Sequence, residues 1–165
     1  MVPRGADAVL VVAFLNTLDV ESGTDDVATQ EAWERWVAEH DLAPAGQVAD
    51  AVAARAALRA AAGDGPPIEV EVPVSAGVVD GRPATVPADA AGAVLLAASR
   101  LADAGAWARV KLCAAETCRW AYVDESRNRS RAWCSMETCG NRAKARSFRA
   151  RARAHSDPTG PLLPS

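Results

Sequence analysis

The sequence predicts an α+β protein that is mainly α, with a helical N-terminal domain carrying a small β-hairpin and a small four-cysteine module that ends in a helix. Three observations favour this fold class. Apolar residues recur at helical spacing through most of residues 1–107, a segment near 68–86 alternates with the period of a strand, and all four cysteines fall within 27 residues. We therefore expect two domains, residues 1–107 and 108–155, and a disordered tail at 156–165.

Four helices are expected in the N-terminal domain. They cover residues 6–18, 30–40, 44–62 and 88–104, with Thr29 as the N-cap of the second helix and Pro44 opening the third. Gly105 ends the fourth. The apolar residues that these helices would turn toward the core are Val9, Val12, Ala13, Leu15, Trp33, Trp36, Val37, Val48, Val52, Ala56, Val94, Leu95, Leu96 and Leu101.

Strand patterns separate the third helix from the fourth. Residues 68–74 alternate between apolar and polar or proline positions, and Pro73 places this segment at the edge of a sheet. Residues 77–86 carry valines on both sides of an Asp80-Gly81 turn signal. This dipeptide between two apolar runs predicts a hairpin.

Charge divides the chain more sharply than the net charge of -3 indicates. Residues 1–108 hold six Lys/Arg against sixteen Asp/Glu, a net of -10, and residues 109–165 hold twelve against five, a net of +7. An acidic half joined to a basic half suggests two tasks, and the basic half suggests a polyanionic partner.

The four cysteines form two matched pairs, Cys113-x4-Cys118 and Cys134-x4-Cys139, separated by fifteen residues. Two close pairs across a loop are typical of a tetrahedral four-thiolate site for one structural Zn²⁺, which leaves no open coordination position. The alternatives are two disulfides, four free thiols or an iron–sulfur cluster. Disulfides need an oxidising compartment, free thiols would not fall into matched pairs, and the spacing differs from that of ferredoxins.

The residues around these cysteines resemble the CGNR zinc finger. The resemblance covers about residues 109–153 and rests on residues 112–118, 124–131 and 133–146, including the tetrad Cys139-Gly140-Asn141-Arg142 that names the family. It implies zinc binding by the four cysteines. It also implies an N-terminal ABATE domain, the partner domain in stress-induced transcription regulators, and residues 14–18 (Phe-Leu-Asn-Thr-Leu) are similar to the opening motif of that domain.

Arginines gather around the predicted metal site. On a helix after Cys139, four of them would form one stripe, beside an apolar stripe of Ala145, Phe148 and Ala152 suited to pack on the zinc knuckles. The loop between the cysteine pairs adds three more. Because the arginine fork fits phosphate, we expect nucleic acid to be bound by Arg127, Arg129, Arg131, Arg142, Arg146, Arg149 and Arg153. The resemblance to a family of transcription regulators implies DNA rather than RNA.

Other interpretations of the basic module remain open. It could dock on an acidic protein partner, or on the acidic half of its own chain. Within the tetrad, Gly140 would permit a turn that other residues resist and Asn141 would cap the following helix, whereas Arg142 fits an anion contact as well as a structural role.

The N-terminal domain shows no catalytic constellation. His40 and His155 are isolated, and no glycine-rich phosphate loop or nucleophile motif occurs, so we expect no enzyme, with a cryptic catalytic pocket as the weakest alternative. A pocket for a small effector could be lined by Asn16, Thr17, Trp33 and Trp36, although the tryptophans fit a core equally well. The domain would sense this effector or form a homodimer. Without a membrane span or export signal, we expect a cytoplasmic protein.

Overall fold

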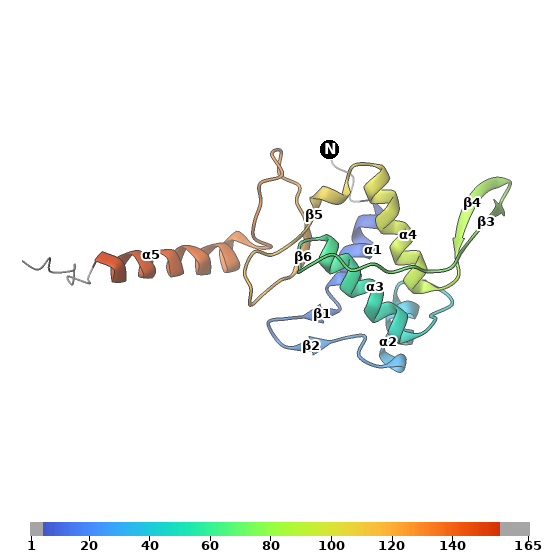
Figure 1. Cartoon of the computed structure of the whole chain (residues 1–165), viewed down its shortest axis with the longest axis horizontal. Coiled ribbons are helices and arrows are strands. Elements are labelled where there is room, and N and C mark those ends of the chain that lie inside the picture. The colour runs from blue at the N-terminus through green and yellow to red at the C-terminus, as the bar shows by residue number, and fades with distance from the viewer. Residues whose placement is uncertain (1–4, 156–165) are drawn as a thin grey trace, which may run out of the picture.

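The computed structural model describes residues 5–155, and the side chains through residue 152. The predicted tail at 156–165 and the side chain of Arg153 therefore lie outside the described residues. A helical body occupies the centre of the molecule, a β-hairpin projects from one side, and a long helix extends from the other (Figure 1). The predicted fold class is confirmed, since a mainly helical N-terminal region with small hairpins precedes a four-cysteine module that ends in a helix.

Four α-helices build the body, namely α1 (Ala6–Leu15), α2 (Gln30–Glu39), α3 (Val48–Ala61) and α4 (Ala90–Asp103). The Thr29 cap is confirmed, because its hydroxyl accepts a hydrogen bond from the Ala32 amide at 3.2 Å. Asp89 caps α4 in the same way, through the Gly92 amide at 2.8 Å. Trp33 and Phe14 are fully buried and their rings contact each other at 5.9 Å, which anchors α2 on α1.

Two helices start or end away from their predicted limits. The first ends at Leu15 rather than residue 18, because Asn16 turns out of helical geometry and its side chain bonds elsewhere in the chain. The third begins at Val48 rather than Pro44. Gly46 has a φ of +73°, and a Cβ there would lie 2.6 Å from an oxygen of Asp89, so the chain must pass Asp89 closely before a helix can form.

The buried faces of two helices also differ from the prediction. In α1 the core residues are Ala8, Val11, Phe14 and Leu15, whereas Val9 is 57% exposed. In α3 the predicted row of Val48, Val52 and Ala56 faces outward or lies at the margin, and the opposite face is buried. That face carries Arg55 and Arg59, each only 4% exposed. The prediction failed there because apolarity alone cannot identify a core position that an arginine fills with its stem.

Buried arginines are tolerated in α3 because each has polar partners. Arg55 donates to both carboxylate oxygens of Asp25, at 2.7 and 2.6 Å, and to the hydroxyl of Thr17 at 2.8 Å. Asp25 belongs to β2 (Thr24–Asp25), which pairs with β1 (Leu18–Asp19). The Arg55 hydrogen bond holds the pKa of Asp25 below its usual value. The acidic loop after α1 is thus fastened to α3.

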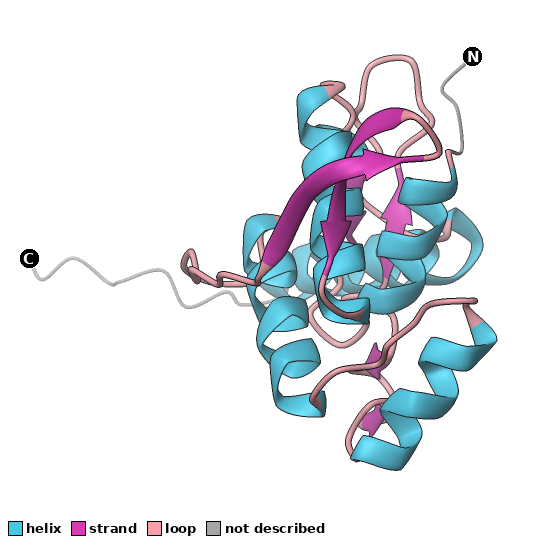
Figure 2. Ribbon diagram, turned by 90° about the vertical axis from the view of Figure 1, so that its right-hand side faces the viewer, coloured by secondary structure: helices cyan, strands magenta, loops and turns pink. Residues whose placement is uncertain are grey.

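The predicted hairpin is confirmed as β3 (Val74–Val79) paired antiparallel with β4 (Arg82–Pro87). Asp80 and Gly81 form its turn, with φ of 51° and 73°, the left-handed pair that a two-residue hairpin turn requires. Residues 68–73, expected as part of a strand, form no strand and reach β3 as extended chain. The hairpin stands out from the body beside α4 (Figures 1 and 2).

A further small hairpin escaped the sequence analysis, because its strands have only three residues each. It pairs β5 (Val110–Leu112) with β6 (Ala121–Val123) after the one-turn helix η1 (Trp107–Arg109). Val110, Leu112 and Ala121 are buried in the same cluster as the helices of the body. One hydrophobic core therefore continues across the predicted boundary at residue 108.

Asn16 joins the two parts by hydrogen bonds in both directions. Its side-chain amide donates to the Ala121 carbonyl at 3.0 Å, and its side-chain oxygen accepts from the Ala121 amide at 2.7 Å. Arg59 adds a second link, donating to the Leu15 carbonyl of α1 and to the Arg119 carbonyl just before β6. The half-buried Asn16 side chain thus completes the ladder of β6 from the end of α1.

Replacing this asparagine tests the junction. Asn16→Ala leaves the amide and carbonyl of buried Ala121 without partners, so we expect a loss of about 1–3 kcal/mol in unfolding free energy. Urea unfolding followed by circular dichroism measures it. Asn128→Ala, in an exposed loop, is the matched control and should change stability by no more than about 0.5 kcal/mol. Equal stability of the two variants would contradict the role given to Asn16.

Candidate metal centre and basic surface

The cysteine pairs are brought together by two short turns. Cys113 directly follows β5, and its amide donates to the Trp120 carbonyl at 2.9 Å. The Cys118 amide donates to the Ala115 carbonyl at 2.9 Å and closes the first turn. Cys139 lies in η2 (Met136–Gly140), a π-helical turn capped by the Ser135 hydroxyl. The two turns face each other, as the spacing predicted.

The four sulfur atoms fit a tetrahedral metal. All lie within 4.8 Å of one another, with Sγ separations of 3.7 Å for Cys118–Cys134 and 3.8 Å for Cys134–Cys139. Zinc at about 2.3 Å from each sulfur requires edges of about 3.8 Å. Cys113, Cys118 and Cys139 are buried and Cys134 is half-buried. The cysteines thus form a closed four-thiolate zinc site, whose metal holds structure rather than performing chemistry.

Burial favours the neutral form of two of the thiols, those of Cys134 and Cys139. It raises the pKa of Cys139 to about 11, and it also raises the pKa of Cys134. Because zinc binds thiolates, loading the site releases protons, and the affinity for zinc falls as the pH falls.

Asp124 anchors the arginine-bearing loop between the cysteine pairs. It is fully buried and accepts hydrogen bonds from Lys111 Nζ at 2.6 Å, the Ser126 amide at 2.9 Å and the Arg131 amide at 3.0 Å. Burial disfavours its charge, but the bonds from Lys111, Ser126 and Arg131 outweigh burial and hold the pKa of Asp124 well below its usual range. This stabilisation is present above about pH 4 and is lost as the pH falls further.

Lys111 completes the attachment of this loop. Its ammonium group also donates to the backbone carbonyls of Arg129 and Arg131. Arg109 donates to the carbonyls of Asp124 and Ser126 at 2.8 and 3.1 Å. Two cations therefore hold the loop by its backbone, while the side chains of Arg127 and Arg129 remain exposed.

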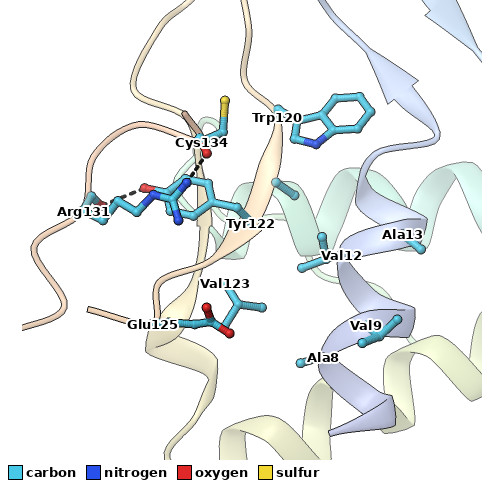
Figure 3. Close-up of a pocket in the computed structure, with 11 residues that line it drawn as sticks. Ala8, Val9, Val12, Ala13, Trp120, Tyr122, Val123, Glu125, Arg131 and Cys134 are labelled. Carbon is cyan, nitrogen blue, oxygen red and sulfur yellow. Dashed lines mark hydrogen bonds between the residues drawn. The ribbon is translucent and has the colours of Figure 1, made fainter. Parts of the chain in front are cut away.

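Arg131 is placed differently from the other predicted DNA-binding arginines. Its guanidinium carbon lies 4.8 Å from the centre of the Tyr122 ring, and it donates to the Cys134 carbonyl (Figure 3). It also donates to the Trp133 carbonyl. The Tyr122 hydroxyl in turn donates to the Arg131 carbonyl at 2.7 Å. This half-buried arginine therefore supports the chain on either side of the metal centre.

The remaining predicted contacts lie on α5 (Asn141–His155), which extends away from the rest of the molecule (Figure 1). Arg146 and Arg149 are exposed there. Arg142 is also exposed, but its Nη1 lies 2.6 Å from Oε1 of Glu21 in the acidic loop of the body. The side chain of Arg153 lies beyond the described side chains.

The expected packing of α5 on the zinc knuckles is wrong. Phe148 is 68% exposed, and Ala145 and Ala152 are exposed as well. The helix leaves the metal centre as a continuation of η2 and extends outward (Figure 1), which leaves its apolar stripe exposed.

Two roles expected within the tetrad also need correction. Asn141 does not cap α5; its side-chain amide donates to the Glu137 carbonyl one turn earlier, at 3.0 Å, because the helical path already began in η2. Gly140 has no left-handed φ. A Cβ at this position would lie 3.0 Å from the Met136 sulfur and 3.5 Å from the Trp133 ring, so close packing beside Cys139 explains the glycine.

The residues of the predicted effector pocket have structural contacts. Trp33 and Trp36 are buried and stack on each other at 5.3 Å, Thr17 accepts from Arg55, and Asn16 binds Ala121. A pocket lined by these four residues stays a prediction. A cleft of about 460 Å³ lies instead between α1 and β6, with Val9, Trp120 and Tyr122 among its lining residues (Figure 3).

Removing one thiolate tests the metal centre. Cys134→Ser, or chelation of the wild type, should abolish stoichiometric zinc and melt η2 and α5, because structural zinc supplies about 10–16 kcal/mol of folding free energy to such modules. The helices α1–α4 keep their own core and should persist. Metal analysis and amide NMR spectra provide the measurement, with Thr117→Ser as control. A Cys134→Ser chain that retains one zinc and an intact α5 is the opposing result.

Comparison with known proteins agrees with the chemistry of this site. No curated protein matches the chain. No family match to the ABATE domain was found for the N-terminal part. Within residues 5–155, no helix combines the length and apolarity needed to cross a membrane. Residues 109–152 match the CGNR zinc finger family, and this segment contains all four clustered cysteines.

Proposed function

We propose that this protein is a zinc-dependent DNA-binding transcription regulator without enzymatic activity. In this proposal residues 108–155 contact DNA, and residues 1–107, as an ABATE-like domain, sense an effector or mediate dimerisation. The observation that carries the proposal is α5, a projecting helix with six Lys/Arg and no Asp/Glu between residues 141 and 155.

The isolation of α5 favours a partner. Its residues from Asn141 to Ala152 are exposed, apart from half-buried Ala143, so the body contributes little to its stability. A single helix of this length is marginal in water, and its like charges at neighbouring turns repel each other. An anionic partner relieves that repulsion, and bidentate arginine contacts suit phosphate.

The shape of α5 favours duplex DNA among the polyanions. A helix with its side chains is about 10–12 Å across, and the major groove of B-DNA is about 12 Å wide. The major groove of duplex RNA is too narrow and deep for such a helix. Arg127 and Arg129, on the loop that Asp124 and Lys111 hold, provide further exposed charges for the phosphates beside the groove.

The second candidate is a protein-interaction module that docks on an acidic partner or on its own acidic domain. The ion pair between Arg142 and Glu21 favours it, because it already joins the basic helix to the acidic half of the chain. Both side chains are about half exposed, at 54% and 51%, so water and salt weaken this pair. A phosphate can therefore replace Glu21, and the contact is compatible with DNA binding.

The salt dependence of binding tests the DNA proposal. For the zinc-loaded full chain and a labelled duplex, the logarithm of the affinity should fall steeply with the logarithm of salt concentration. Arg146→Ala should weaken binding and reduce this slope by about 0.9, the value for one lost phosphate contact. Fluorescence anisotropy measures both quantities, and duplex RNA of the same sequence should bind more weakly.

The matched control is Arg35→Ala, which removes an exposed arginine from α2 on the acidic body. It should leave affinity and slope unchanged. Equal effects of the two substitutions, or tighter binding to an acidic peptide than to DNA at the same salt concentration, would favour the protein-interaction candidate.

Glu21 provides a separate prediction. Glu21→Gln removes the carboxylate that pairs with Arg142, so that this arginine becomes available to phosphate and the affinity for DNA rises a few-fold at low salt. Glu31→Gln, which removes an exposed charge from α2 without breaking a contact to α5, should leave the affinity almost unchanged. Weaker binding by the Glu21→Gln chain would contradict the competition.

A further inference from the structure

The β3–β4 hairpin exposes an unusual amount of apolar surface. All six residues of β3 are exposed, and the exposed fractions of Val74, Val78, Val79 and Val86 range from 40% to 72%. The hairpin meets the body at its base, where Pro87 lies against Gly92 of α4, while its tip projects freely (Figures 1 and 2). A two-stranded sheet is marginally stable alone, so extension by further strands would stabilise it.

The register of the hairpin determines which backbone groups face outward. With a two-residue turn, the closing pair Val79–Arg82 is hydrogen-bonded and the pairs alternate from there. The hydrogen bond from the Ala88 amide to the Pro73 carbonyl, two residue pairs beyond Ser75–Val86, follows this pattern. The outward-facing residues of β3 are therefore Val74, Ala76 and Val78, and those of β4 are Pro83, Thr85 and Pro87.

The two edges differ in their capacity to bind another strand. Proline has no amide hydrogen, so two of the three outward positions of β4 cannot donate. The three outward positions of β3 offer both amides and carbonyls. The β4 edge of this exposed hairpin is thus closed to pairing, and the β3 edge is open. Such a hairpin can add one further strand at β3 but cannot build a growing stack of strands.

We infer that β3 pairs with β3 of a second copy of this chain, antiparallel about a two-fold axis at Ala76. This pairing places Val74 of each copy opposite Val78 of the other, so the edge is self-complementary, as an isologous interface requires. The resulting sheet has four strands, with both outer edges formed by the proline-bearing β4. Assembly therefore stops at the dimer.

Charge complementarity favours a second copy over an unrelated strand. Continued beyond β3, this register carries Glu71 of one copy past Val79 of the other and toward its turn, where Arg82 is paired with Val79. The side chains of Glu71 and Arg82 are exposed, and neither forms an ion pair within residues 5–155. The two-fold axis creates this Glu71–Arg82 proximity twice.

Proline substitutions on the two edges test the inference. Ala76→Pro removes an outward amide of β3, and Thr85→Pro removes the only outward amide of β4; neither takes a hydrogen bond from the hairpin itself. For the zinc-loaded full chain, sedimentation velocity over a dilution series should show a dimer for the wild type and for Thr85→Pro. Ala76→Pro should raise the dimer dissociation constant at least tenfold. A monomeric wild type, or equal effects of the two prolines, overturns the inference.

A charge exchange identifies the partner as a second copy. Arg82→Glu should weaken the dimer, because it sets Glu71 of one copy beside a new carboxylate of the other. The double variant Glu71→Arg with Arg82→Glu should restore the wild-type dissociation constant. Failure of the double variant to recover beyond the single one overturns the proposed register, and the sedimentation of both variants also shows whether the chain remains folded.

Discussion

The convergence of four thiolates is the constraint on which the C-terminal half depends. Apart from the sulfurs, the buried cluster around them contains only Ala115, with Trp133 packed against it. So small an apolar cluster cannot offset the conformational entropy of the segment that it organises. The arginine-bearing loop is joined to the metal centre at both ends, through Cys118 and Cys134. The helix α5 continues from the turn that carries Cys139, so it takes its position from the metal centre.

The position of the metal centre relative to the body depends on a different set of contacts. The β5–β6 hairpin carries Cys113 and shares the hydrophobic core of the helices. Hydrogen bonds between Asn16 and Ala121 then fix β6 to the end of α1, and Arg59 of α3 donates to the Arg119 carbonyl just before β6. Asp64 accepts from both Arg59 and Arg119, which joins α3 to the first cysteine turn. These contacts join the helical body to the strands and the turn that carry Cys113 and Cys118.

The parts that the sequence predicted well are those with strong local signals. The cysteine spacing determined the site, the Asp80-Gly81 turn determined the hairpin, and Thr29 marked the start of α2. The predictions failed where a residue depends on a partner that is distant in the sequence. Arg55 and Arg59 are buried because distant partners satisfy them, and Asn16 ends α1 because Ala121, 105 residues later, supplies its hydrogen bonds. Periodicity and composition contain no information about such partners.

At the metal site too, the features with a local sequence signal were predicted and those that depend on tertiary packing were missed. Its ligands could be named from spacing, yet the direction of α5 could not, because the apolar stripe of Phe148 gave no sign that the helix would leave the body. Asp124, which shapes the loop, was also missed, since a single aspartate among arginines resembles a solvated residue until its burial is known. The exposed basic helix and the exposed arginines of the loop are the basis of the proposed function.

Amide NMR of the zinc-loaded chain during titration with a short DNA duplex tests this account most directly. The account predicts chemical-shift changes concentrated in residues 127–131 and along α5, with α2 and the β3–β4 hairpin unaffected. Changes centred on the helical body, or a spectrum that DNA leaves unaltered at low salt, would contradict it.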